Sequence, residues 1–160
     1  MKPTLLAGAL GIVVIGLAPS ASFAQAKEPL MQPNSEAAAN VPAGELTLGT
    51  VRLPRGIKAD GKELPAGTYK VRLTTQEAAG KAPGATPSYE RVVEFLQGTA
   101  VKAREVATIV PNADIGKVAK GKPPAPGTSR VERLRGDEFV RVWINQGGNH
   151  YLIHFPTAAA

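Results

Sequence analysis

The 160-residue chain contains no cysteine and few aromatic side chains. The lack of cysteine excludes a disulfide framework, a cysteine-ligated zinc or iron–sulfur site and a thiol nucleophile. Aromatic residues make up 5% of the chain, and Trp143 is the single tryptophan. Stability must therefore come from an ordinary packed core.

Long hydrophobic runs are confined to the N-terminus. Lys2 precedes an apolar run over residues 5–17, and small residues follow up to Ala24, which predicts a secretory signal peptide over residues 1–24, cleaved after Ala24 or Ala26. The run is shorter than the roughly 20 residues that cross a bilayer, so we expect no transmembrane segment in the mature chain. We expect a periplasmic or secreted location.

The exported part is basic and rich in turn-forming residues. The formal charge of the chain is +6, and loss of Lys2 leaves +5. The chain has 17 glycines and 14 prolines, which favour short strands joined by tight turns over long helices. We therefore predict a flexible leader over residues 25–44, one β-sandwich domain over residues 45–156 and a tail over residues 157–160.

Alternating and β-branched patterns after residue 45 predict an all-β, antiparallel β-sandwich of about seven to eight strands, ending in a three-strand meander. Two segments rich in glycine and proline, 76–88 and 112–129, are expected to be exposed, mobile loops. The strands are expected at residues 46–53, 57–59, 67–75, 89–97, 100–110, 130–135, 138–146 and 149–155.

Residues 64–71 contain Leu-Pro-Ala-Gly-Thr-Tyr, with the tyrosine at position 69. This segment resembles the start of a strand in uncharacterised secreted bacterial β-sandwich modules. The resemblance implies a β-sandwich and no particular activity.

Two turn dipeptides set the register of the C-terminal meander. Gly136-Asp137 and Gly147-Gly148 are typical two-residue hairpin loops, so residue 135 should pair with 138 and residue 146 with 149. One face of the meander is then apolar and belongs to the core. It consists of Val131, Val140, Val142, Ile144, Tyr151, Ile153 and Phe155, with Arg133 toward an outer edge.

The opposite face of the meander mixes charged, polar and aromatic side chains. On it the register pairs Glu132 with Arg141 and places Arg130 across from Trp143, where its guanidinium could cover the indole ring. A solvated outer face is the favoured interpretation; a recognition surface and a face covered by another part of the chain are the alternatives. The candidate ligand-binding residues are Arg130, Glu132, Arg141, Trp143, Asn145, His150 and His154.

Patterns for catalysis, metals and nucleotides are missing from the sequence. His150 and His154, the only histidines, lie about 13 Å apart on a regular strand, too far to share a metal. The chain contains no Gly-x-Ser-x-Gly elbow and no phosphate-loop fingerprint. We therefore predict no catalytic residues, no metal and no cofactor, and export argues against a nucleic-acid partner.

The favoured function is an exported, non-catalytic binding or structural module of the bacterial envelope. Its partner is open, with an envelope protein or an anionic glycan as the candidates. One alternative is a carbohydrate-binding or anionic-ligand-binding module that uses an exposed face around Trp143. The other is a small envelope enzyme or an accessory domain of one.

Overall fold

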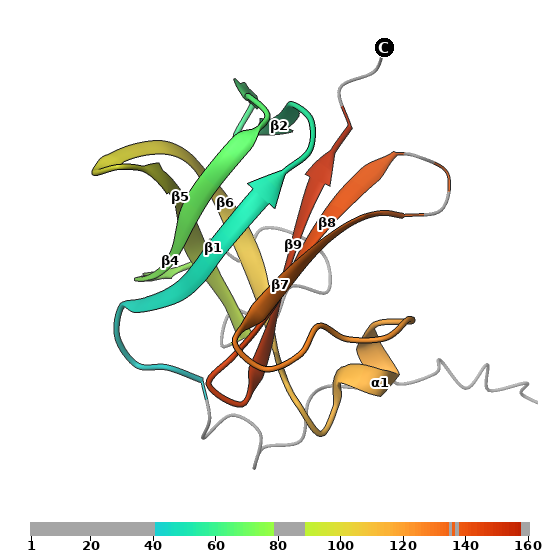
Figure 1. Cartoon of the computed structure of the whole chain (residues 1–160). Helices are drawn as coiled ribbons and strands as arrows, with labels where there is room; N and C mark the ends of the chain where they lie inside the picture. The colour runs from blue at the N-terminus through green and yellow to red at the C-terminus, as the bar shows by residue number, and fades with distance from the viewer. Residues whose placement is uncertain (1–40, 79–88, 135, 137, 158–160) are drawn as a thin grey trace, which may run out of the picture. The chain divides into compact units, whose positions relative to one another are not determined.

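The computed structural model describes residues 41–78, 89–134, 136 and 138–157 (Figure 1). These residues form nine strands and one four-residue helix, α1, and the all-β class predicted from the sequence is confirmed. No helix among them is long and apolar enough to cross a membrane. The elements are β1 (Leu46–Leu53), β2 (Ile57–Ala59), β3 (Lys62–Leu64), β4 (Gly67–Glu77), β5 (Glu90–Gln97), β6 (Ala100–Pro111), α1 (Ile115–Val118), β7 (Thr128–Arg133), β8 (Phe139–Gln146) and β9 (Asn149–Pro156).

Seven of the strands form a single antiparallel sheet in the order β1-β4-β5-β6-β9-β8-β7. β2 and β3 form a separate ribbon that lies against β6 and β9. The ribbon turns at Asp60 and Gly61, whose φ values of 47° and 71° are those expected of an Asp-Gly hairpin turn. The sequence predicted β2 but not β3, which is three residues long.

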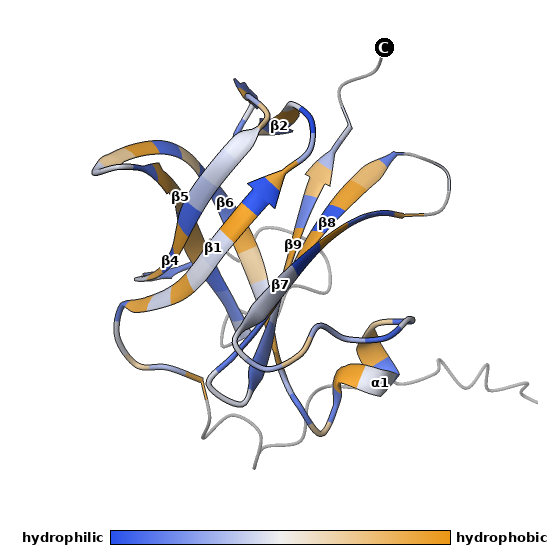
Figure 2. Ribbon diagram, viewed as in Figure 1, coloured by the Kyte–Doolittle hydropathy of each residue, from blue (hydrophilic) through white to orange (hydrophobic). Residues whose placement is uncertain are grey.

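The concave face of the sheet holds the hydrophobic core. Apolar residues alternate with more polar ones along most of the strands (Figure 2), so one face of each strand is buried in the core. On β8 and β9 part of the opposite face is buried as well. Phe95 packs edge-to-face against Tyr69 and Phe155, with centroid distances of 6.4 and 5.4 Å. Ile57, Ala59 and Leu64 of the ribbon complete the same core.

The two edge strands of the sheet, β1 and β7, lie next to each other. Six successive antiparallel pairings leave them running in the same direction. No backbone ladder joins them in the described residues; instead the Ser129 hydroxyl donates a hydrogen bond of 3.0 Å to the carbonyl of Thr50. We call this junction the seam.

The predicted register of the C-terminal meander is confirmed. Arg130 pairs with Trp143 and Glu132 with Arg141 across β7 and β8, and Gln146 pairs with Asn149 across β8 and β9. Gly147 and Gly148 both have positive φ, 61° and 81°, as a two-residue primed turn requires. Of the other turn, Asp137 lies outside the described residues. The seven residues predicted for the apolar face all belong to the core or pack against it.

The prediction of an exposed loop over residues 112–129 is confirmed for most of its side chains, but two of them are buried and part of the segment is helical. This segment contains α1 and buries Ile115 and Ala119 against the outer face of the sheet. A single helical turn carries too little periodicity to be recognised in a sequence rich in proline and glycine. Most of the other predicted loop, residues 79–88, lies outside the described residues.

The Leu-Pro-Ala-Gly-Thr-Tyr segment forms the turn between β3 and β4. The Tyr69 hydroxyl donates a hydrogen bond of 2.8 Å to the carbonyl of Pro65, four residues earlier. The Tyr69 ring lies in the core while its polar end fixes the turn. This contact explains why the turn and the tyrosine occur together.

Candidate functional site

The seven candidate residues predicted from the sequence lie on the outer face of β7, β8 and β9, in the predicted rows. Most of this face is nevertheless covered, and the expectation of an exposed surface around Trp143 is wrong. The exposed fractions are 0% for Trp143, 2% for His150, 6% for Asn145 and 8% for Arg141, whereas Arg130 and His154 remain exposed and Glu132 is half-buried.

Residues 112–127, which we call the strap, cover this face. The strap is held at both ends by backbone hydrogen bonds, from Asn112 to the carbonyl of Gly148 (3.1 Å) and from Gly127 to that of Asn145 (2.7 Å). Between the ends, three side chains of β7 and β8 donate to alternate carbonyls of the strap. The pairs are Arg141 with Lys120 (3.2 Å), Arg130 with Lys122 (3.0 Å) and Asn145 with Pro124 (2.9 Å).

Trp143 and His150 form a buried polar pair beneath the strap. Trp143 Nε1 donates to His150 Nδ1 at 3.0 Å, and the two rings are edge-to-face at 5.7 Å. Because Nδ1 accepts this bond, His150 must be neutral with its proton on Nε2. The apolar side chains that pack with Trp143 are Val110, Ile115, Ala119 and Leu152.

The cation over the indole ring is Arg141, not Arg130 as the sequence predicted. The Arg141 guanidinium carbon lies 4.7 Å from the ring centroid of Trp143. The predicted ion pair between Glu132 and Arg141 is confirmed, with Arg141 Nε donating at 2.7 Å. Arg130 instead reaches the strap and Glu132. Of the predicted binding residues, Arg130, Arg141 and Asn145 therefore hold the strap. Arg141 and His150 contact Trp143.

Both histidine side chains have pKa values below their ordinary range. Burial lowers the pKa of His150. The pKa of His154 is lowered first by partial desolvation and then by the positive charge of Arg141. Neutral imidazole is therefore the favoured form of both rings in the folded chain.

We expect the free energy of unfolding to decrease as the pH falls below about 6.5, the ordinary pKa of histidine. The unfolded chain takes up protons in that range, whereas folded His150 and His154 resist protonation until the pH reaches their lower folded pKa values. Urea unfolding between about pH 7.5 and about pH 5.5 measures the effect, above the range in which most carboxylates titrate. The double variant His150→Gln/His154→Gln should lose most of this pH dependence; an unchanged slope would contradict the assignment.

An ion-pair network on the outer face of β4, β5 and β6 was not predicted from the sequence. Glu94 is 5% exposed, and it accepts hydrogen bonds from Arg72 at 2.5 Å and from Arg104 at 2.9 and 3.0 Å. Hydrogen bonds from Arg72 and then from Arg104 lower the pKa of Glu94. The three residues form one cross-strand row, so correct pairing of β4, β5 and β6 would have indicated the network.

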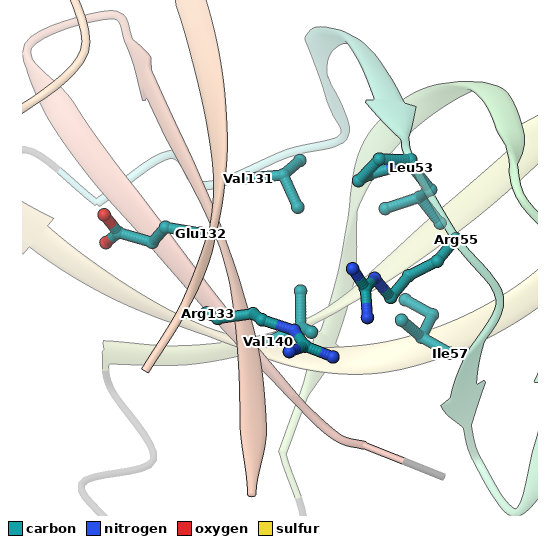
Figure 3. Close-up of a pocket in the computed structure, with 8 residues that line it drawn as sticks. Leu53, Arg55, Ile57, Val131, Glu132, Arg133 and Val140 are labelled. Atoms are coloured by element: carbon teal, nitrogen blue, oxygen red, sulfur yellow. The ribbon is translucent and has the colours of Figure 1, made fainter. Parts of the chain in front are cut away.

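A small hollow opens at the seam, where β1 ends and the chain continues to β2. Its aliphatic walls are Leu53 and Ile57 on one side and Val131 and Val140 on the other (Figure 3). Its volume is about 80 Å³. The hollow lies beyond the Ser129–Thr50 hydrogen bond, toward the end of β1. We call it the seam hollow.

Arginines from the two sides of the seam mark the mouth of this hollow. The side chains of Arg55 and Arg133 extend toward one another, whereas the carboxylate of Glu132 points away (Figure 3). That carboxylate is engaged by Arg141 and Arg130. Arg55 forms no ion pair with another described residue. The seam hollow is therefore an apolar recess with positive charge at its mouth.

The described residues contain no group of three or more metal-ligating side chains that could hold an ion. The Ser129 hydroxyl is engaged in the hydrogen bond to Thr50 across the seam. No protein-family model, curated protein or solved structure matches the chain. The site must therefore be interpreted from its own chemistry.

Proposed function

We propose that the protein is an exported, non-catalytic binding module of the bacterial envelope and that the seam hollow is its ligand site. The observation that carries the proposal is the apolar recess with arginine at its mouth. Protein interiors are normally close-packed, and an apolar pocket with a few convergent polar groups is the usual form of a binding site. The signal-peptide pattern supports export to the periplasm or the exterior.

The size of the hollow limits what it can bind. Whole small-molecule sites usually measure about 300–1,000 Å³, several times the volume of the seam hollow, about 80 Å³. The hollow therefore accommodates a terminal group, and the rest of a larger ligand remains outside.

A ligand screen followed by a cavity-filling variant tests the proposal. Compounds that shift the backbone amide signals of residues 53, 55–57 and 131–133 in NMR spectra of the purified chain identify binding at the hollow. Val131→Ile adds one methyl group at the wall and should weaken binding several-fold without loss of stability. Val101→Ile is the matched control because Val101 is 40% exposed on β6, away from the hollow.

The outcome that contradicts the proposal is specific. If no glycan, peptide or small amphiphile shifts those amide signals, the seam hollow is not a ligand site. Binding that is equally strong in the wild type and in Val131→Ile also overturns the assignment, provided that the variant remains folded.

A further inference from the structure

We infer that the ligand group of the seam hollow is a carboxylate on a short aliphatic chain. This inference rests on the proposed function and specifies its chemistry. It follows from three properties of the hollow: its volume, its aliphatic walls and the guanidinium at its mouth.

The volume and the walls determine the buried part of the ligand. A hollow of about 80 Å³ is too small for a whole small-molecule ligand, so the buried part of the ligand is a short group of a few methylenes. Water in a cavity needs two to four polar partners, which the walls of leucine, isoleucine and valine cannot supply. An aliphatic group that displaces poorly ordered water from such a recess gains affinity.

The mouth of the hollow determines the charge of the ligand. A guanidinium binds a carboxylate through two parallel hydrogen bonds, a geometry that an alcohol or an amine cannot reproduce. Arg55 lies two residues after Leu53, so the positive charge and the apolar wall are joined by Pro54 alone. A ligand must therefore carry its anionic group within a few atoms of its aliphatic end, as a short carboxylate does.

Arg55 is the residue that we assign to the carboxylate. It follows the end of β1, and its side chain is directed across the mouth of the hollow (Figure 3). It forms no ion pair with the other described residues, so its charge is available to a ligand. The carboxylate nearest in sequence on the opposite side, Glu132, is engaged on the outer face by Arg141.

The test compares probes of equal length and different charge. Pentanoate, 1-pentanol and pentylammonium are titrated into the purified chain, and binding is followed by the amide signals of residues 53, 55–57 and 131–133. Pentanoate should bind about tenfold or more tightly than 1-pentanol, because the charge-assisted hydrogen bonds are lost in the alcohol. Pentylammonium should not bind, and acetate should bind more weakly than pentanoate because it lacks the aliphatic chain.

Two variants connect the preference to Arg55. Arg55→Gln should bind pentanoate and 1-pentanol equally, whereas Arg52→Gln should retain the preference because Arg52 is exposed on β1 and does not line the hollow. N-acetylvaline is a further probe, because it carries the carboxylate of a peptide C-terminus. If it binds more tightly than pentanoate, a peptide C-terminus is the source of the carboxylate.

The possible failures distinguish the two proposals. Equal binding of pentanoate and 1-pentanol to the wild type overturns the carboxylate and leaves the seam hollow as an apolar site. The absence of any response from residues 53, 55–57 and 131–133 to all probes overturns the carboxylate as well, and with the wider ligand screen also negative it removes the proposed site.

Discussion

Trp143→Ala should lower the free energy of unfolding by about 3–5 kcal/mol, the usual cost of removing a large buried aromatic side chain. Trp143 is fully buried between the sheet and the strap. Its removal leaves a cavity and deprives His150 of its hydrogen-bond donor. Chemical denaturation followed by circular dichroism measures the loss.

Phe139→Ala is the matched control for this substitution. Phe139 lies on the same strand and the same face as Trp143, but it is 43% exposed and beyond the strap. Its replacement should change stability by no more than about 1 kcal/mol. If Trp143→Ala does not fold, Trp143→Phe provides the comparison, because it keeps a ring and loses the hydrogen bond to His150. Equal effects at positions 139 and 143 would contradict the burial of Trp143.

Glu94→Ala should lower the free energy of unfolding by about 1–3 kcal/mol, the range for losing charged hydrogen bonds. The substitution removes the carboxylate that holds Arg72 and Arg104 together on neighbouring strands. Both arginines are partly exposed, so water compensates for some of the loss. Thermal or urea unfolding at neutral pH measures the difference from the wild type.

The pH dependence separates this effect from simple loss of packing. Because the folded pKa of Glu94 is lowered, its contribution is present above the ordinary pKa of glutamate, about 4.3, and is lost as the pH falls toward the folded value. The difference between wild type and Glu94→Ala should therefore shrink in acid. Arg104→Ala removes only one of the two partners of Glu94 and should cost less, within about 1 kcal/mol, because Arg104 is exposed. A constant difference at all pH values would show that the ion pairs are not responsible.

The strands and the register of the meander could be predicted because their causes are local. Apolar residues alternate with polar ones along β8 and β9, and Gly147-Gly148 fixes how those strands pair. A shift of one residue would place Arg141 in the core and Val142 outside. The same local pattern placed Trp143 and His150 on the outer face correctly.

The burial of that outer face could not be predicted because its cover comes from a segment without periodicity. The strap has one helical turn and a run of prolines, and it is held by side chains that donate to its carbonyls. Prolines lack the amide proton needed for a strand ladder, so the segment has the sequence of a loop although it packs like a structural element. Of the three interpretations of the outer face of the meander, the one in which another part of the chain covers it is correct.

The seam hollow depends on contacts that are distant in the sequence. Leu53 ends β1, and Val131 belongs to the strand at the other edge of the sheet. Only the curvature of the whole sheet brings the two edges together, and no motif near either residue indicates it. Nothing in the sequence therefore distinguished Arg55 from the other arginines and lysines as a candidate binding residue.

Quenching of tryptophan fluorescence by acrylamide tests most directly whether the predicted recognition face is structural. Trp143 is the single tryptophan, so the signal reports on that position alone. Its emission should be blue-shifted and only weakly quenched in the folded chain, and strongly quenched after unfolding in urea. Quenching of the folded chain as strong as that of the unfolded chain would show that Trp143 is exposed and that the strap does not cover it.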